Sequence, residues 1–103
     1  MQVSFFETAH YRSPAALPAG WPIPPAAYDL DAGAAAYRGM VERLHLVERL
    51  GFDWISVAEH HYSHRRLTPA PMIVAAHLAA QSSRIKIAIL GPIVSHGNPV
   101  RIA

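Results

Sequence analysis

The sequence contains no cysteine and few charged residues, and each shortage excludes a class of protein. Without cysteine, these 103 residues can form no disulfide, thiolate metal site or cysteine nucleophile. Charged residues make up 16% of the chain, and the formal net charge is only +2. The basic side chains are scattered rather than gathered in a run. A nucleic-acid-binding surface requires concentrated positive charge, so we expect no nucleic-acid partner.

Long apolar runs are missing too. No stretch approaches the ~20 apolar residues that cross a bilayer, and the first residues lack the basic segment and apolar run of a signal peptide. We therefore expect no membrane partner and a cytoplasmic location. Hydrophobic residues nevertheless account for 51% of the chain, which is enough to bury a core.

Periodicity and composition predict alternating strands and helices. We expect strands at residues 3–6, 52–58 and 85–90, where β-branched and aromatic residues gather. An apolar stripe at spacings of three and four predicts a helix over residues 32–50, capped by Asp29 or Asp31. A second helix, opened by Thr68 and Pro69 or Pro71 and ending at Gln81, is apolar nearly all round. We therefore expect it to be substantially buried, with His77 as a core or interface histidine.

Two further segments are recognisable by their prolines. The stretch after the first strand is predicted to be a loop, packed on the protein through Trp21 and Tyr28, because its prolines forbid a helix or central strand. These prolines are Pro14, Pro18, Pro22, Pro24 and Pro25. Near the end of the sequence, Asn98 and Pro99 are typical of the first residues of another helix.

The alternation predicts an α/β fold with parallel strands. An open doubly wound sheet would carry a glycine-rich phosphate loop after its first strand, but that loop contains Gly20 alone. We therefore favour the first three strands of a parallel (β/α)8 TIM barrel. Such a barrel needs about 250 residues, so residues 1–103 are expected to be the incomplete N-terminal part of one barrel domain, and marginally stable in isolation.

The densest polar cluster, residues 59–64 (EHHYSH), follows the second strand. Active sites of barrels lie at the carboxyl ends of the strands, and His60 there could serve as a general base or acid near neutral pH. An equally ordinary explanation of the cluster is that its histidines lie in a solvated loop without a catalytic role. A metal site formed by His60, His61 and His64 is a third, but His60 and His61 would point to opposite faces of a continuing strand. Leu90 and Gly91 end the third strand at the same rim, where an ordinary turn is the alternative.

A series of motifs resembles the bacterial-luciferase-like flavin-dependent monooxygenases. The segments are 51–54 (GFDW), 58–62 (AEHHY), 67–71 (LTPAP), 75–80 (AAHLAA), 85–87 (IKI), 91–94 (GPIV) and 98–101 (NPVR). They occur in the family's order and at its spacing. The resemblance covers most of residues 33–103.

This resemblance implies a TIM barrel, usually a homodimer, that uses reduced FMN from a flavin reductase and molecular oxygen to oxidise a small organic substrate. His60 matches an active-site base of the family. Glu59 and the Leu90–Gly91 peptide match positions that line the flavin ring, the latter where luciferase has a cis peptide bond. The resemblance does not identify the substrate, and the proline-rich loop argues against light emission from an aldehyde.

Alternatives within and outside the family stay open at this point. A related barrel could use the deazaflavin coenzyme F420 in place of FMN. Another relative could bind a flavin without turnover. Outside the family, the histidine-rich rim could belong to a metal-dependent barrel hydrolase, although we assign no metal ligand from the sequence.

Overall fold

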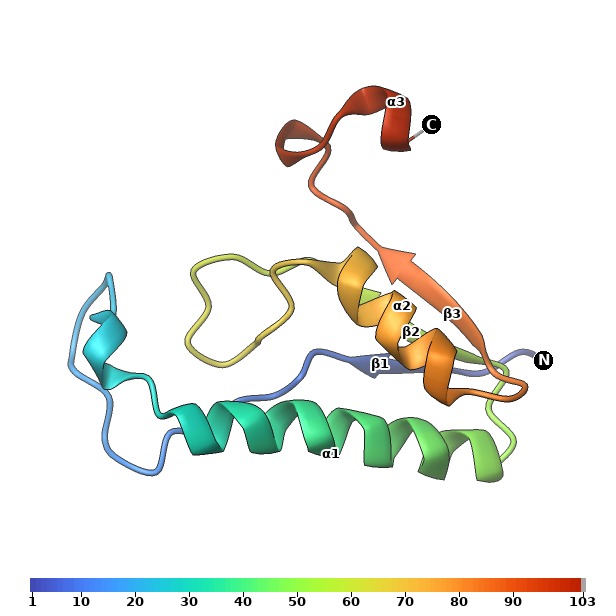
Figure 1. The fold of residues 1–103 in the computed structure, drawn as a ribbon, viewed down its shortest axis with the longest axis horizontal. Coiled ribbons are helices and arrows are strands. Elements are labelled where there is room, and N and C mark those ends of the chain that lie inside the picture. Colours follow the sequence, from blue (N-terminus) through green and yellow to red (C-terminus); the bar gives the residue numbers. More distant parts are fainter. Residues whose placement is uncertain (103) are drawn as a thin grey trace.

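Three parallel strands form the framework of the chain, as the sequence predicts (Figure 1). They are β1 (Ser4–Glu7), β2 (Trp54–Ala58) and β3 (Lys86–Leu90), and β2 lies between the other two. This is a computed structural model, and it describes residues 1–102. The fold is α/β with an open sheet, and the order of its elements corresponds to the beginning of a (β/α)8 barrel.

The pairing register brings the carboxyl ends of the strands to one edge of the sheet. Phe6 of β1 is opposite Ser56 of β2. At the end of β2, Ala58 is opposite Leu90, the last residue of β3. Residues that follow these strands therefore emerge next to one another, which is the arrangement that positions the candidate site.

The first long helix, α1 (Leu30–Arg49), begins and ends with the signals expected from the sequence. The side chain of Asp29 accepts a hydrogen bond from the backbone N–H of Ala32 (2.7 Å), which satisfies a donor of the first turn. At the other end Gly51 adopts φ +85°, and its N–H donates to the carbonyl of Glu48 (3.2 Å). This left-handed glycine turns the chain directly into β2.

One face of the sheet packs against both long helices. The buried core cluster consists of Ala9, Met40, Leu44, Val47, Ile55, Val57, Val74, Leu78 and Ile85. Ile55 and Val57 supply the β2 side of this core, because alternate residues of a strand share a face. Ser56 lies on the opposite face, where its Oγ hydrogen-bonds Ser4 Oγ (2.5 Å). Among the described residues, the helices therefore pack on the Ile55 and Val57 face of β2, and Ser56 lies on the other face.

The second long helix, α2 (Pro71–Gln81), is less buried than its composition predicts. Its buried residues are Pro71, Val74 and Leu78. Met72 and Ile73 are 65% and 73% exposed, and His77 is exposed as well. The expectation of a substantially buried helix is therefore wrong for the described residues, and His77 is not a core residue, because only one side of α2 faces β2, β3 and α1 (Figure 1).

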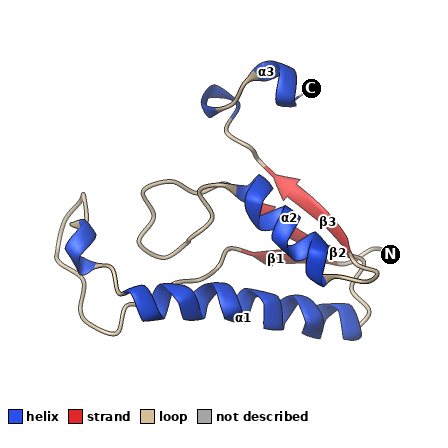
Figure 2. Cartoon of the chain, in the orientation of Figure 1, coloured by secondary structure: helices blue, strands red, loops and turns tan. Residues whose placement is uncertain are grey.

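The proline-rich stretch is a loop, as predicted, and it contains one short 3-10 helix, η1 (Pro25–Ala27) (Figure 2). Tyr28 stacks on Tyr11 with the ring centroids 5.2 Å apart. The hydroxyl of Tyr11 accepts a hydrogen bond from the N–H of Asp29 (3.0 Å). Aromatic packing therefore anchors the loop beside the start of α1.

Two short elements complete the described chain. A 3-10 helix, η2 (Val94–His96), follows β3 and leads to α3 (Pro99–Ile102). Asn98 Oδ1 accepts a hydrogen bond from the N–H of Val100 (2.9 Å), which confirms the predicted start of this helix. Among the described residues, no helix combines the length and apolar character needed to span a membrane.

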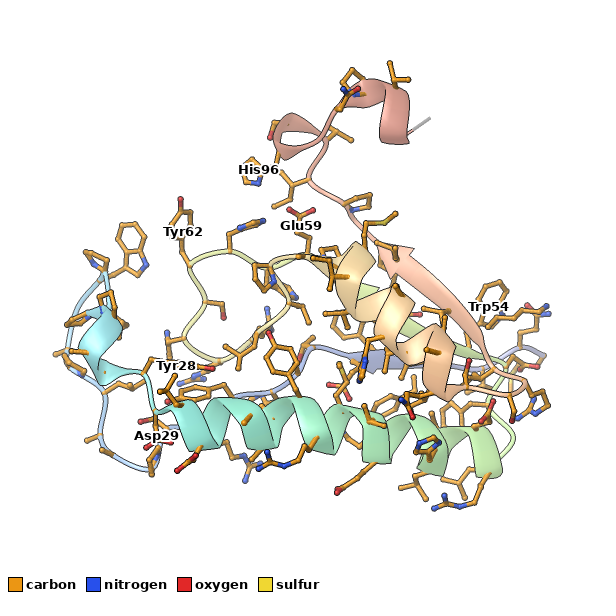
Figure 3. All side chains as sticks on the ribbon, in the orientation of Figure 1. Tyr28, Asp29, Trp54, Glu59, Tyr62 and His96 are labelled. Carbon is orange, nitrogen blue, oxygen red and sulfur yellow. The ribbon has the colours of Figure 1, made fainter. Side chains whose placement is uncertain are left out.

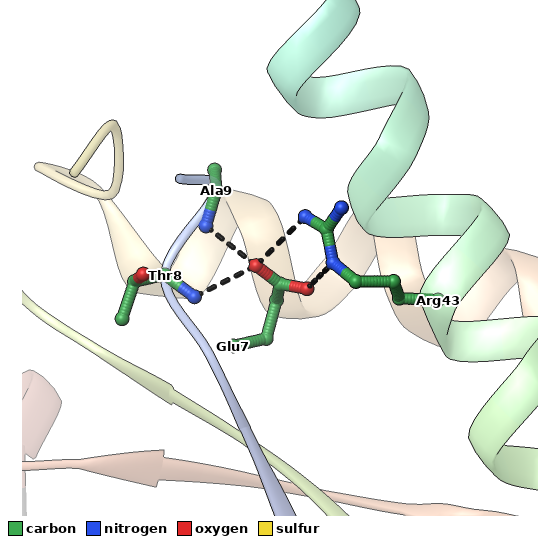
Figure 4. Close-up of polar contacts among 4 residues, drawn as sticks. All are labelled: Glu7, Thr8, Ala9 and Arg43. Carbon is green, nitrogen blue, oxygen red and sulfur yellow. Dashed lines mark hydrogen bonds and ion pairs between the residues drawn. The ribbon is translucent and has the colours of Figure 1, made fainter. Parts of the chain in front are cut away.

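A buried carboxylate ties β1 to α1 (Figure 4). The strand ends one residue later than the sequence predicts, so that Glu7, only 3% exposed, belongs to it. Its carboxylate accepts hydrogen bonds from the N–H groups of Thr8 (2.8 Å) and Ala9 (2.7 Å). Arg43 donates to both oxygens, from Nε at 2.6 Å and from Nη2 at 3.1 Å. This bidentate pair neutralises a charge that would otherwise be buried alone.

We expect Arg43→Met to destabilise the protein by about 2–3 kcal/mol because it leaves the Glu7 carboxylate buried without a cation. This figure is below the range of about 3–5 kcal/mol for breaking wholly buried pairs, since the Arg43 side chain is 38% exposed. Urea unfolding of the protein in its natural length measures the change. Arg38→Met, on the exposed side of the same helix, is the control and should change stability by less than about 0.5 kcal/mol. Equal losses in both variants would contradict this role of Arg43.

A second carboxylate holds the turn before β3. Glu48 Oε1, near the end of α1, accepts hydrogen bonds from the N–H groups of Ser83 (3.1 Å), Arg84 (2.6 Å) and Ile85 (2.8 Å). These contacts, led by those from Ile85 and Arg84, lower the pKa of Glu48 from 4.5 to about 2. The charged form of Glu48 therefore helps to fix where β3 begins, and with it where β3 ends.

The Glu48 contacts should stabilise the fold in a pH-dependent way. Since the pKa of Glu48 is lower in the folded chain, its contribution is fully present above about pH 5 and is lost as the pH falls through about 2. Glu48→Gln should lower the melting temperature at pH 7, because an amide offers one acceptor oxygen and adds unwanted donors. The difference from the unsubstituted protein should shrink toward pH 2, whereas a difference independent of pH would argue against the carboxylate. Glu42→Gln, at an exposed position of α1, is the control.

Candidate functional site

The carboxyl ends of β2 and β3 lie side by side and carry the residues singled out in the sequence. Ala58 pairs with Leu90, so Glu59 and Gly91 follow at adjacent positions of the same edge. His60 comes one residue later. The predicted proximity of the two strand ends is therefore confirmed.

Glu59 is the centre of the polar contacts at this edge (Figure 3). Its side chain is 11% exposed. Oε1 contacts Nε2 of His61 at 2.5 Å, and Oε2 accepts a hydrogen bond from the N–H of Ile93 at 2.7 Å. These contacts, first that of His61 and then that of Ile93, lower the pKa of Glu59. One carboxylate thus links the end of β2 to the segment that follows β3.

His96, from η2, joins the same cluster, which sequence reasoning missed. Its Nδ1 lies 3.4 Å from Nε2 of His61 and 3.6 Å from Oε1 of Glu59. The two imidazole rings meet edge to face, with centroids 4.7 Å apart. The available signal was the position of His96 in the segment directly after β3, which parallel pairing brings beside the end of β2.

His60 differs from the other histidines of the rim. Its backbone N–H donates to the carbonyl of Thr68 (3.0 Å), which fixes the loop after β2. Its Nε2 is buried and has no hydrogen-bond partner among the residues that the structure describes. Burial, followed by the positive charge of Arg66, lowers the pKa of His60. The side chain is therefore favoured in its neutral form, and its Nε2 has no polar partner among the described residues.

Gly91 adopts a conformation that most other residues avoid. Its φ is +61°, and no atom outside its immediate neighbours would contact a Cβ added there. The cis peptide bond recorded in the described chain joins Trp21 to Pro22. The Leu90–Gly91 bond is not cis. The left-handed glycine, rather than a cis bond, turns the chain away from β3.

An apolar pocket of about 200 Å³ lies beside the polar edge, between the proline-rich loop and the loop after β2. Its lining includes Trp21, Tyr28, Tyr62 and Leu67. Trp21 and Tyr62 form an edge-to-face pair with ring centroids 6.0 Å apart. Tyr62 adopts φ +55°, a backbone conformation that costs a non-glycine residue about 1–3 kcal/mol and is concentrated at functional sites.

Comparison with known proteins places this edge in a family context. A family model described as luciferase-like monooxygenase matches residues 18–103, which include all four predicted site residues. The chain belongs to the luciferase-like monooxygenase family. Membership accounts for the parallel α/β arrangement of the chain.

Relatives within the family include the alkanal monooxygenase β chains of Vibrio harveyi and Photorhabdus luminescens. The former is 34% identical over 64 residues, which is 62% of this chain and 20% of that protein. The latter is 36% identical over the same lengths. The solved structure of apo-MsnO8 superposes with a TM-score of 0.74 at 27% identity and covers 99% of this chain and 26% of that one. The chain therefore spans about a fifth of the length of the curated relatives it matches.

Within this luciferase-like chain, the four residues predicted from the sequence occupy one edge. Glu59 and His60 follow β2, and Leu90 and Gly91 end β3. They differ in their surroundings, since Glu59 is engaged with neighbours whereas His60 retains a buried free nitrogen.

Proposed function

We propose that the protein is a flavin-dependent monooxygenase that uses reduced FMN and molecular oxygen on an organic substrate. The observation that carries this proposal is the buried, unpartnered Nε2 of His60, which follows the end of β2, while the left-handed Gly91 follows the paired end of β3. Glu59 and the Leu90–Gly91 peptide would line the flavin, and Gly91 without a side chain leaves room for a flat ring. Family membership supports FMN over coenzyme F420.

Reduced flavin, when bound, supplies the two electrons with which one oxygen atom enters the substrate and the other becomes water. His60 would exchange a proton at Nε2 with the bound reactants. Its lowered pKa keeps the ring neutral near pH 7, which is the state that a general base requires. The hydrogen bond from the His60 backbone to Thr68 holds the residue in place for this task.

The rest of the proposal concerns the whole protein. We expect a flavin reductase to supply the reduced FMN, a homodimer in solution and a location in the cytoplasm. Residues 1–103 would contribute the first three β/α units of a single barrel domain. The arrangement of β1, β2 and β3 supports this, since it follows the order in which a barrel is built.

His60→Gln should lower turnover about 10²–10⁴-fold, the usual contribution of a general acid or base, and should leave FMN binding within about threefold. Glutamine preserves polarity and approximate size but cannot accept and release the proton. Substrate-dependent oxygen consumption with a reductase measures turnover, and flavin fluorescence measures binding. His77→Gln, at an exposed position of α2, is the matched control. If His60→Gln turned over at the unsubstituted rate, His60 would have no role in the chemistry.

We also propose that the apolar part of the substrate occupies the pocket between the proline-rich loop and the loop after β2. The pocket is lined mainly by aromatic and aliphatic side chains, which favour an apolar group over a charged one. Tyr62 connects the two regions, because its ring borders the pocket and lies 6.4 Å from that of His61. A substrate held there could extend toward the polar edge.

Trp21→Ala should raise the KM for an apolar substrate about tenfold, which corresponds to about 1.4 kcal/mol, and should change kcat by less than about threefold. The indole is 69% exposed and contacts Tyr62 edge to face, so its removal opens the pocket without disturbing the core. Oxygen consumption over a range of substrate concentrations separates the two constants. Leu46→Ala removes an exposed apolar side chain of α1 and is the control. A KM unchanged by Trp21→Ala would place the substrate elsewhere.

A further inference from the structure

Three side chains at the polar edge meet with the atoms that transition metals prefer as ligands. They are the carboxylate of Glu59 and the imidazoles of His61 and His96, and one ligand atom from each lies within 4.8 Å of the other two. We propose that these residues form a binding site for a divalent transition-metal ion, for which Zn²⁺ is the test case. The proposal does not use His60, but it shares Glu59 with the proposed flavin lining.

The distances suit a tetrahedral ion. Zinc bonds to nitrogen and oxygen are about 2.0–2.2 Å long, which separates neighbouring ligand atoms by about 3.3–3.6 Å at tetrahedral angles. His96 Nδ1 lies 3.4 Å from His61 Nε2 and 3.6 Å from Glu59 Oε1. The third separation, 2.5 Å between Glu59 and His61, is a direct contact, which the ion would replace by spreading the two groups about 1 Å apart.

The surroundings of the three ligands also suit an ion. Glu59 is held from behind by the N–H of Ile93 at Oε2 (2.7 Å), which is the kind of outer contact that orients metal-binding carboxylates. The exposed fractions of the side chains rise from 11% for Glu59 to 29% for His61 and 52% for His96. The cluster is thus anchored on its inner side and open to solvent on the outer one, where water could complete the coordination.

The ligand types determine which ions are expected. Two imidazole nitrogens and one carboxylate oxygen suit zinc, copper, nickel or iron, whereas Mg²⁺ and Ca²⁺ prefer oxygen ligands alone. Three protein ligands leave a fourth tetrahedral position for water or a small molecule. The sequence did not reveal this set of ligands. His60 and His61 were expected to point to opposite faces of a continuing strand, but β2 ends at Ala58, so both residues lie in the loop that follows.

Isothermal titration of the metal-free protein in its natural length with Zn²⁺ tests the site. We expect one high-affinity ion per chain, at least 100-fold weaker binding in His96→Ala, and unchanged affinity in His64→Ala, an exposed histidine of the same loop. Mg²⁺ should not compete. Equal zinc affinity in His96→Ala and the unsubstituted protein would mean an adventitious ion only and would overturn the proposal.

A second variant, His96→Cys, tests the site by spectroscopy in case His96→Ala fails to fold. Co²⁺ bound to His96→Cys should show a thiolate-to-cobalt charge-transfer band in the near ultraviolet, absent from the unsubstituted protein, because the new sulfur would be a ligand. A folded His96→Cys protein without that band would also overturn the proposal. Neither measurement depends on turnover, so failure of the metal site and failure of the His60 proposal are distinguishable.

Discussion

The register between β2 and β3 is the constraint on which the candidate site depends. With Ala58 opposite Leu90, Glu59 can reach past the end of β3 to the N–H of Ile93. A shift of one residue would reverse the faces of every β3 side chain and would separate Glu59 from its partners. The turn held by Glu48 fixes this register at the start of β3. A structural carboxylate, Glu48, and a candidate functional carboxylate, Glu59, therefore act at opposite ends of the β2–β3 strand pair.

Glu7 and Glu59, the carboxylates at the carboxyl ends of β1 and β2, have different roles. Glu7 is almost fully buried and bound to Arg43. Its carboxylate therefore joins β1 to α1 and is not available to a ligand. Glu59 contacts two histidines and one backbone N–H at a partly open edge. Its environment retains the charged form and leaves the outer side of the cluster accessible. Burial and partner type, rather than position along a strand, separate the structural role from the functional one.

The sequence predicted the helices and strands well because their signals are local. Asp29, Gly51 and Asn98 each mark a helix boundary through a hydrogen bond or dihedral angle within a few residues. The contact of His96 with His61 was not predictable in this way, since it joins loops 35 residues apart whose paths depend on tertiary packing. The exposure of α2 was missed for a related reason, because composition does not reveal how many neighbours surround a helix.

Tyr62 lies on the loop after β2, between the apolar pocket and the polar cluster (Figure 3). Its ring borders the pocket with Trp21 and also lies near His61. Because Glu59 belongs both to the proposed flavin surroundings and to the proposed metal ligands, an ion and a flavin would compete for one carboxylate. Linkage then requires each to weaken the binding of the other by the same factor, so the two proposals together imply a monooxygenase site that responds to metal concentration.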